Sequence, residues 1–239
     1  MSAPSRPAAP MPCWNVRLSH AVGDERRRFT LELDLRTAAR RLVLAGPSGA
    51  GKTLTLLAVA GLLAPRDGRI AIDGETLLDT PSGISLPARD RRCGVMFQDY
   101  ALFPHLTVRQ NVAFGRHRGW RNPRERDDGD PRVAEVLDRL ELAAVAHQRP
   151  HELSGGQRQR TALARALVIQ PRALLLDEPF AALDPALRGR LRDDLDQVLR
   201  EQDLPLLMIS HDPADLERFG QAVARIEEGR VASWEEVAA

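Results

Sequence analysis

The chain has 239 residues, of which 43% are hydrophobic and 28% are charged, a mix typical of a globular protein with enough apolar material for a packed core. Its 34 basic and 33 acidic residues leave a formal net charge of +1, so the basic excess of a nucleic-acid binder is missing and we expect no nucleic-acid partner. Two distant cysteines, Cys13 and Cys93, indicate a reducing compartment rather than a disulfide framework. The longest stretch without a charged residue, 53–65, has 13 residues and is too short to cross a bilayer.

The N-terminal third predicts a tail followed by strands and one helix. Residues 1–12 include four prolines and no apolar core, so we expect a disordered tail and not a signal peptide. Alternating apolar residues predict strands at 14–20 and 29–35, and the charged turn between them favours an antiparallel pair. The continuous apolar run 42–45 is typical of a central strand that is covered on both faces. A helix at 53–63 and a strand at 69–72 follow.

The remaining chain predicts a loop and then a regular alternation of strands and helices. The segment 115–132 is charged and contains glycine and proline, which predicts a solvated loop. Helices are predicted at 131–142, 154–169, 185–201 and 213–219, and strands at 173–176, 205–209 and 222–226. This alternation predicts a mostly parallel sheet in an α/β fold, and we find no internal repeat.

A glycine-rich segment lies directly between the apolar run 42–45 and the first predicted helix. It fits the phosphate-binding pattern G-x-x-x-x-G-K-[ST] and comprises Gly46, Pro47, Ser48, Gly49, Ala50, Gly51, Lys52 and Thr53. The glycines let backbone N–H groups turn toward a polyphosphate at the positive end of a helix. Lys52, the sole lysine of the chain, supplies a charge to the β- and γ-phosphates, and Thr53 offers a hydroxyl to Mg²⁺. The alternative, a glycine turn that only caps a helix, leaves this combination unexplained.

Two carboxylates, Asp177 and Glu178, end the predicted strand 173–176 and precede a proline. An aspartate at this place can hold Mg²⁺ beside Thr53, and the glutamate can polarise an attacking water as a general base. Alone, the pattern is that of a polar turn. Together with the phosphate-binding loop it predicts a site of nucleotide hydrolysis.

A second candidate anion site opens the predicted helix 154–169. Ser154 and Gln157 have the spacing of a capping box, which is the purely structural interpretation. A cap does not require Gly155 and Gly156, however. Two glycines behind a serine at a helix N-terminus can approach a phosphate closely, so the segment also predicts a phosphate contact.

In order and spacing, these motifs resemble those of the nucleotide-binding subunit of ATP-binding-cassette (ABC) transporters over roughly residues 14–229. The segment 153–157 is similar to the family signature, Gln98 to the Q-loop, 182–184 to the D-loop, and Ser210-His211 to the switch histidine. Any one of these matches could arise by chance, whereas their common order could not.

The resemblance implies a fold and a domain organisation. The fold is an α/β P-loop NTPase with a RecA-like core, a small antiparallel β subdomain and an inserted α-helical subdomain at about 89–165. The nucleotide-binding domain is expected to span 13–239, with no C-terminal regulatory domain after it.

The resemblance also implies that two copies, as a homodimer, sandwich two ATP molecules head to tail, with Mg²⁺ as the second cofactor. Each ATP would lie between the phosphate-binding loop of one subunit and the signature of the other. Beyond that loop, the residues implied to bind nucleotide are Ser154, Gly155, Gly156, Gln157 and Asp184. Those implied to act toward the metal are Thr53, Gln98 and Asp177. Those implied in catalysis are Glu178, which activates water, His211, which contacts the γ-phosphate, and Gln98, which senses Mg²⁺ and the membrane partner.

Because the sequence has no membrane span, a transport pore would come from separate permease subunits, which favours an importer. We expect a peripheral protein at the cytoplasmic face of the inner membrane that serves, indirectly, a solute-binding protein. The segment 97–106 on the Q-loop is expected to meet the permease. The alternative is that it packs on its own helical subdomain.

The segments 73–79, 83–87, 91–92 and 95–98 look most like those of molybdate importers, and sulfate importers are similar. The segment 183–188 and the short chain also resemble thiamine importers, so molybdate or a related oxoanion is the expected cargo and thiamine or another small solute the alternative.

Non-transport ATPases fit the sequence less well. A DNA-repair or chromosome-maintenance ATPase would need a long coiled coil between Lys52 and Ser154, where 101 residues lie without heptads. A translation factor of this family would carry two cassettes, a regulatory module would not need Glu178 with His211, and a P-loop kinase has no use for the signature.

The sequence departs from the family at one position. The family commonly places an aromatic residue near the end of the first strand, where it stacks on adenine. That position falls near Val22 here, with His20 and Trp14 close by in the sequence, so no stacking residue is named.

Overall fold

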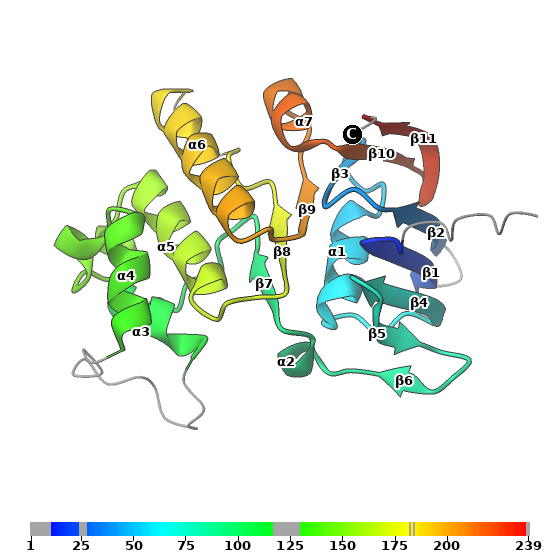
Figure 1. The fold of residues 1–239 in the computed structure, drawn as a ribbon, viewed down its shortest axis with the longest axis horizontal. Coiled ribbons are helices and arrows are strands. Elements are labelled where there is room, and N and C mark those ends of the chain that lie inside the picture. The colour runs from blue at the N-terminus through cyan, green and yellow to red at the C-terminus, as the bar shows by residue number, and fades with distance from the viewer. Residues whose placement is uncertain (1–10, 24–27, 117–129, 182, 184, 238–239) are drawn as a thin grey trace, which may run out of the picture.

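Two β-sheets lie next to each other in the part of the chain that the computed structural model describes, which comprises residues 11–23, 28–116, 130–181, 183 and 185–237 (Figure 1). One sheet has the strand order β2-β1-β4-β5-β6, and the other has the order β11-β10-β3-β9-β8-β7. The strands are β1 (Trp14–Gly23), β2 (Arg28–Thr37), β3 (Arg41–Ala45), β4 (Asp67–Ile72), β5 (Glu75–Asp79), β6 (Ile84–Ser85), β7 (Cys93–Met96), β8 (Ala173–Asp177), β9 (Leu206–Ile209), β10 (Ala222–Glu227) and β11 (Arg230–Glu236).

Helices connect the strands and cover the second sheet. They are α1 (Lys52–Ala60), α2 (Ala88–Arg91), α3 (Val108–Phe114), α4 (Pro131–Arg139), α5 (Gly155–Leu167), α6 (Pro185–Glu201) and α7 (Pro213–Phe219), with short 3-10 helices η1 (Ala143–Val145) and η2 (Pro150–Glu152). Figure 1 shows α3, α4 and α5 gathered at the side of the molecule away from the first sheet. None of the described helices has the length and hydropathy needed to cross a bilayer.

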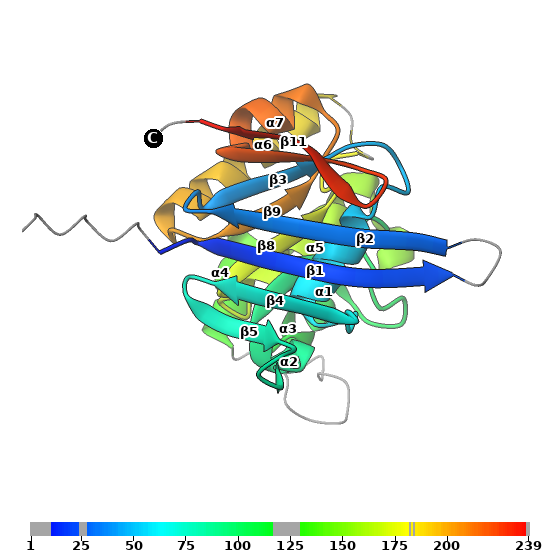
Figure 2. The ribbon, with the colours of Figure 1, turned by 90° about the vertical axis from the view of Figure 1, so that its right-hand side faces the viewer.

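The first sheet is antiparallel and confirms the predicted hairpin. β1 pairs with β2 from Trp14 opposite Thr37 to Gly23 opposite Arg28, so both strands are longer than predicted. Leu31, Leu33 and Leu35 lie on the buried face of β2, as their alternation predicts. Figure 2 shows this sheet lying in front of α1.

The second sheet confirms the predicted parallel architecture. β10, β3, β9, β8 and β7 are parallel in that order, and β11 joins the edge in the antiparallel direction. Strand β8 is buried along its whole length. Leu174 and Leu176 pack into one apolar core with the helices, while Ala173 and Leu175 pack into a second core with α1 and the first sheet. The alternation of side chains along β8 therefore joins the two cores.

Several predicted boundaries are wrong. The first helix ends at Ala60 and not at 63, because Gly61 adopts a positive φ of 77° and donates its N–H to the carbonyl oxygens of the last turn. The helix predicted at 131–142 ends at Arg139. The helix predicted at 154–169 spans Gly155–Leu167.

Other predictions fall partly outside the described residues. This applies to most of the predicted loop 115–132, of which 117–129 are not described, and to residues 1–10 of the predicted tail. The helical segment expected at about 89–165 contains β7, a strand of the second sheet, so its α3, α4 and α5 all follow β7.

The turn between β10 and β11 connects the two sheets. Gly229 donates its N–H to Ala50 O at 3.1 Å, and its carbonyl oxygen accepts from Glu32 N at 2.7 Å. Its φ of 80° and the close approach of β2 both require glycine, because an added Cβ would lie 2.0 Å from Thr30 O.

We predict that Gly229→Ala lowers the free energy of unfolding by more than about 3 kcal/mol, because strain and a backbone clash add together. Gly83→Ala is the matched control, since Gly83 also has a positive φ of 69° but nothing lies within 4 Å of an added Cβ. Gly83→Ala should lower the free energy of unfolding by about 1–2 kcal/mol, which is the cost of the left-handed conformation alone. Urea unfolding followed by circular dichroism measures both variants, and equal losses would contradict the role given to the turn.

Candidate functional site

The predicted phosphate-binding loop lies between the end of β3 and the start of α1. Gly46, Gly49 and Gly51 have φ values of 133°, 80° and 104°, which residues with a side chain rarely adopt. A Cβ at Gly46 would lie 2.1 Å from Ile226 O, so the loop sits directly on β10. Gly51 is the N-cap of α1 and has no side chain to accept from the first-turn N–H groups. These donors therefore remain for a ligand at the positive end of the helix.

A cavity of about 460 Å³ lies over this loop. Its lining residues are Val22, Phe29, Ser48, Gly49, Gly51, Lys52, Thr53, Leu54, Gln98, Asp177, Glu178 and Ile209. The structure thus brings together the loop, the Q-loop glutamine and both carboxylates, although Gln98 follows β7 and the carboxylates lie at the end of β8.

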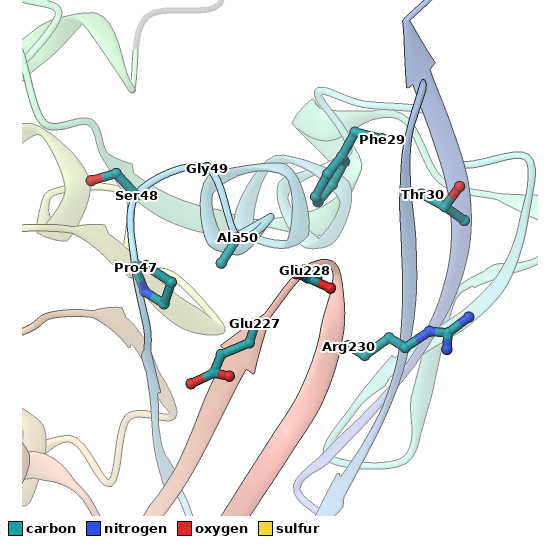
Figure 3. Close-up of a pocket in the computed structure, with 9 residues that line it drawn as sticks. All are labelled: Phe29, Thr30, Pro47, Ser48, Gly49, Ala50, Glu227, Glu228 and Arg230. Atoms are coloured by element: carbon teal, nitrogen blue, oxygen red, sulfur yellow. The ribbon is translucent and has the colours of Figure 1, made fainter. Parts of the chain in front are cut away.

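A second cavity of about 700 Å³ adjoins the first, between the loop, β2 and the turn from β10 to β11 (Figure 3). Its lining residues are Phe29, Thr30, Pro47, Ser48, Gly49, Ala50, Glu227, Glu228 and Arg230. Phe29, Ser48 and Gly49 line both cavities. Figure 3 shows the Phe29 ring on β2 beside the start of α1.

The ammonium group of Lys52 is held against the loop itself. Nζ donates to Gly46 O and to Pro47 O, at 2.8 Å each. A positive charge therefore lies next to the inward-turned glycines, where a polyphosphate requires it.

Thr53 and Asp177 meet as the pattern predicts. Thr53 Oγ1 donates to Asp177 Oδ2 at 3.0 Å, and Asp177 is 5% exposed. Burial raises the pKa of the Asp177 carboxyl and the nearby Glu178 adds to this, while the hydrogen bond from Thr53 and the charge of Lys52 act in the opposite direction. A hydroxyl beside a buried carboxylate fits Mg²⁺, which prefers hard oxygen ligands beside substrate phosphates.

Glu178 and His211 form a contact across two neighbouring strands. The parallel register pairs Asp177 with Ile209, so the residues after β8 and β9 emerge at the same edge of the sheet. His211 Nδ1 lies 2.8 Å from Glu178 Oε1, with the carboxylate as acceptor. Glu178 has a positive φ of 49°, a strained conformation for a residue with a side chain, which is typical of functional positions.

The signature segment forms the predicted capping box. Gln157 N donates to Ser154 Oγ at 3.3 Å, and Ser154 N donates to Gln157 Oε1 at 2.8 Å. Gly156 is buried, and a Cβ there would lie 2.1 Å from Leu187 Cδ2, so this glycine also lets α5 approach α6. In the described part of the chain, none of these residues lines the two cavities at the phosphate-binding loop.

The sequence matches the family described as ABC transporter over residues 30–181. The chain is a member of the ABC transporter family. A solved dimeric structure of a bacterial ABC transporter cassette is similar to this chain, with a TM-score of 0.80 and 27% sequence identity. The match covers 95% of this chain and 99% of the chain of that cassette. A dimeric cassette in a post-hydrolysis state, bound to ADP and Pi, has a TM-score of 0.77 at 28% identity with the same coverage.

Curated relatives of this cassette serve different import systems. The molybdate/tungstate import ATP-binding protein of Archaeoglobus fulgidus is 43% identical over 216 residues, which are 90% of this chain and 84% of that protein. The Fe(3+) ions import ATP-binding protein of Mesorhizobium japonicum is 42% identical over 201 residues, which are 84% of this chain and 53% of that protein. Thiamine, spermidine/putrescine and trehalose/maltose import proteins also match. The chain spans about half the length of several of these relatives.

Among the described residues, an aromatic side chain of the second strand, Phe29, lines both cavities. Trp14 is fully buried and donates Nε1 to Arg40 O, and His20 is half-buried, so neither lines the cavities. Val22 lines the first cavity and pairs with Phe29 across the β1–β2 hairpin. Sequence reasoning missed Phe29 as a cavity residue, because the predicted first strand ended at His20 and the register that sets Phe29 opposite Val22 is seen only in the structure.

The Q-loop segment 97–106 is bound to its own helices at several points. Arg165 on α5 donates to Tyr100 O and Ala101 O, at 2.7 Å each, and its guanidinium lies 5.6 Å from the centre of the Phe103 ring. Leu106 is buried. These contacts support the alternative, in which the segment packs on its own helices. The D-loop residue Asp184 lies outside the described residues.

We predict that Asp177→Asn raises the melting temperature of the nucleotide-free cassette at pH 7.5. The pKa of the Asp177 carboxyl is higher in the folded than in the unfolded chain, so its ionisation destabilises the folded state as the pH rises. The neutral amide of the variant removes this cost and keeps an oxygen that accepts from Thr53. In a chain of this size each kcal/mol shifts the melting temperature by ~2–4 °C. The gain should shrink as the pH falls and the parent carboxyl takes up a proton. Asp34→Asn, on the exposed face of β2, is the control, and a lower melting temperature for Asp177→Asn than for Asp34→Asn would refute the argument.

Proposed function

We propose that this chain is the ATP-hydrolysing subunit of an import system. One observation supports this most strongly: Thr53, Asp177, Glu178 and Lys52 line a single cavity at the phosphate-binding loop. Each group has the chemistry that one part of a bound MgATP requires. The relatives named as import ATP-binding proteins agree with this function.

Different residues of the cavity would bind the phosphates, the metal ion and the base of MgATP. The glycine loop and Lys52 bind the phosphates through N–H groups and an ammonium charge. Thr53 and Asp177 would hold Mg²⁺, and Gln98, which lines the same cavity, would act toward it as well. When bound, Mg²⁺ neutralises charge on the phosphate oxygens. Phe29 presents an aromatic ring for the base, at the place where the first strand supplies none.

Glu178 and His211 would act on the reacting phosphate. The Glu178 carboxylate takes a proton from the attacking water, whose oxygen bonds to the γ-phosphorus as the bond to the bridging oxygen breaks, releasing ADP and phosphate. His211 contacts the γ-phosphate and holds Glu178 through the 2.8 Å contact at Nδ1.

The complete site would need a second copy of the chain. Ser154, Gly155, Gly156 and Gln157 are absent from the linings of both cavities in the described residues, so their contact with ATP would have to come from a partner. The dimeric state of the two structural relatives supports a homodimer. We propose that this pair, with Asp184 near the shared nucleotide, sits at the cytoplasmic face of the inner membrane and drives separate permease subunits supplied by a solute-binding protein.

We propose molybdate or a related oxoanion as the cargo. The molybdate/tungstate relative matches along 84% of its own length, and two molybdenum import relatives match 90% and 87% of this chain. Thiamine is the second candidate, because the thiamine relative of Cereibacter sphaeroides is 42% identical along 84% of its length. The ATPase subunit does not contact the cargo, so transport itself must decide between them.

We predict that Glu178→Gln retains ATP binding and lowers kcat by about 10²–10⁴, the usual contribution of a general base. Lys52→Ala should weaken ATP binding itself, because it removes the charge beside the phosphates. Phosphate release gives kcat, and equilibrium dialysis gives binding. Glu217→Gln, an exposed glutamate on α7, is the control and should behave as the parent. Parent-like turnover by Glu178→Gln would rule out the general-base role.

We predict that cells carrying Glu178→Gln at the native locus contain less molybdenum than parent cells when molybdate is scarce, and that excess molybdate restores the content. The measurement is cellular molybdenum by mass spectrometry in a strain without a second molybdate importer. An unchanged molybdenum content together with reduced thiamine uptake would replace molybdate by thiamine and leave the ATPase function intact.

A further inference from the structure

Arg188 and Arg192 on α6 form hydrogen bonds with the segments that follow β8 and β9, at the edge of the sheet where Glu178 and His211 lie. Arg188 Nη2 donates to Leu183 O at 3.0 Å, in the segment after β8, and its Nη1 donates to Asp212 Oδ2 at 3.1 Å, in the segment after β9. Arg192 Nη2 donates to the same Asp212 oxygen at 2.7 Å, and its Nε donates to Asp215 Oδ1 at 2.6 Å. One helix face therefore holds the two segments that lie beside Glu178 and His211.

Asp212, which accepts from both arginines, directly follows His211, and Asp215, which accepts from Arg192, is hydrogen-bonded to the residue that precedes His211. Ser210 precedes it and donates Oγ to Asp215 Oδ2 at 2.5 Å, and Asp212 follows it and donates its N–H to Ser210 Oγ at 3.2 Å. Ser210 and Asp215 are 1% and 2% exposed, whereas the His211 side chain is 71% exposed. The His211 imidazole is therefore exposed, whereas Ser210 before it is buried and held by its hydrogen bond to Asp215.

Charge explains why arginine is needed at these positions. Asp212 and Asp215 lie close enough to share the Arg192 guanidinium. Burial acts to raise the pKa of Asp212, but hydrogen bonds from Ala214 N–H and Arg192 outweigh it, so the pKa lies below its ordinary value and the carboxylate is ionised. Two neighbouring carboxylates under one loop repel each other unless a cation lies between them, and planar guanidinium groups bind several oxygens at fixed angles.

Arg192 also reaches the segment that follows Glu178, because its guanidinium lies 5.6 Å from the centre of the Phe180 ring. Neither Arg188 nor Arg192 lines the cavities at the phosphate-binding loop. Any effect of these side chains on turnover must therefore pass through the residues that they hold.

We infer that Arg188 and Arg192 are positioning residues that fix His211 relative to Glu178. They hold the Asp212 side chain after His211 and, through Asp215, the Ser210 side chain before it. Arg188 also connects this segment to Leu183, so that Nδ1 stays within hydrogen-bond distance of the Glu178 carboxylate. This inference rests on the proposed function, in which Glu178 and His211 act on the γ-phosphate. It adds the two residues on α6 that set their geometry.

A double-mutant cycle tests the inference in the full chain. In the parent, Arg188→Ala should lower kcat about tenfold with little change in KM for ATP, because misplacing a catalytic group costs turnover rather than substrate binding. In the His211→Ala background the same substitution should change the residual kcat less than about twofold, because residues that act through one another are non-additive. Arg188→Lys, which keeps a positive donor, should recover part of the loss. Arg192→Lys should give a similar split between kcat and KM.

The exposed Arg190 on the same helix supplies the matched control, and Arg190→Ala should match the parent in kcat and melting temperature. The nitrogen chemical shift of His211 Nδ1, measured by nuclear magnetic resonance, gives a readout without turnover. It should change in Arg188→Ala and Arg188→Lys but stay at the parent value in Arg190→Ala.

The outcomes separate this inference from the proposed function. If Glu178→Gln and His211→Ala lose turnover but Arg188→Ala and Arg192→Lys do not, the positioning role is wrong and the proposed function stands. An equal loss on adding Arg188→Ala to parent and to His211→Ala also overturns it, since an additive loss shows an effect that bypasses His211. If Glu178→Gln and His211→Ala both turn over at the parent rate, the catalytic roles proposed for these two residues fail and this inference fails with them, whereas a parent chain without ATP turnover would refute the proposed function itself.

Discussion

The site depends on the complete burial of β8 between two apolar cores. Because its side chains point alternately into the helical core and into the core around α1, the strand cannot slide or rotate without disturbing both. Its last residue, Asp177, is therefore fixed beside Thr53 although burial disfavours an ionised carboxylate there. Neighbouring β9 is held in the same way, so the residues after both strands meet at one edge.

Local patterns predicted the parts of the site that are local in the chain. The strand-loop-helix context of 42–63 placed the glycine-rich loop correctly, because positive φ values are a local requirement that single glycine residues meet. Asp177 and Glu178 were found at the end of an apolar run, which the structure confirms as β8. The carboxyl ends of parallel strands gather at one edge, so this geometry followed from the fold class.

The features that sequence reasoning missed depend on pairing and packing between distant segments. Phe29 borders the cavities only because of its register with Val22 across the hairpin. Strand β11 has few buried residues, so no apolar alternation marks it. Helix α3 was missed although Thr107 and Gln110 form a capping box at its start. The contacts of Arg188 and Arg192 cross from α6 to α7, and in a chain with so many arginines composition gives no sign of which ones matter.

The capping box at Ser154 has a consequence for how firmly two copies could hold together. The Ser154 hydroxyl oxygen already accepts from the backbone N–H of Gln157, and the Gln157 side-chain oxygen accepts from the backbone N–H of Ser154. A phosphate that bound these two N–H groups would therefore exchange existing hydrogen bonds for new ones, and such an exchange contributes less than a bond to an unpaired donor. A contact formed by exchange is easily reversed. In the proposed pair of copies, this helix end would therefore add little to the adhesion between them and would favour their release.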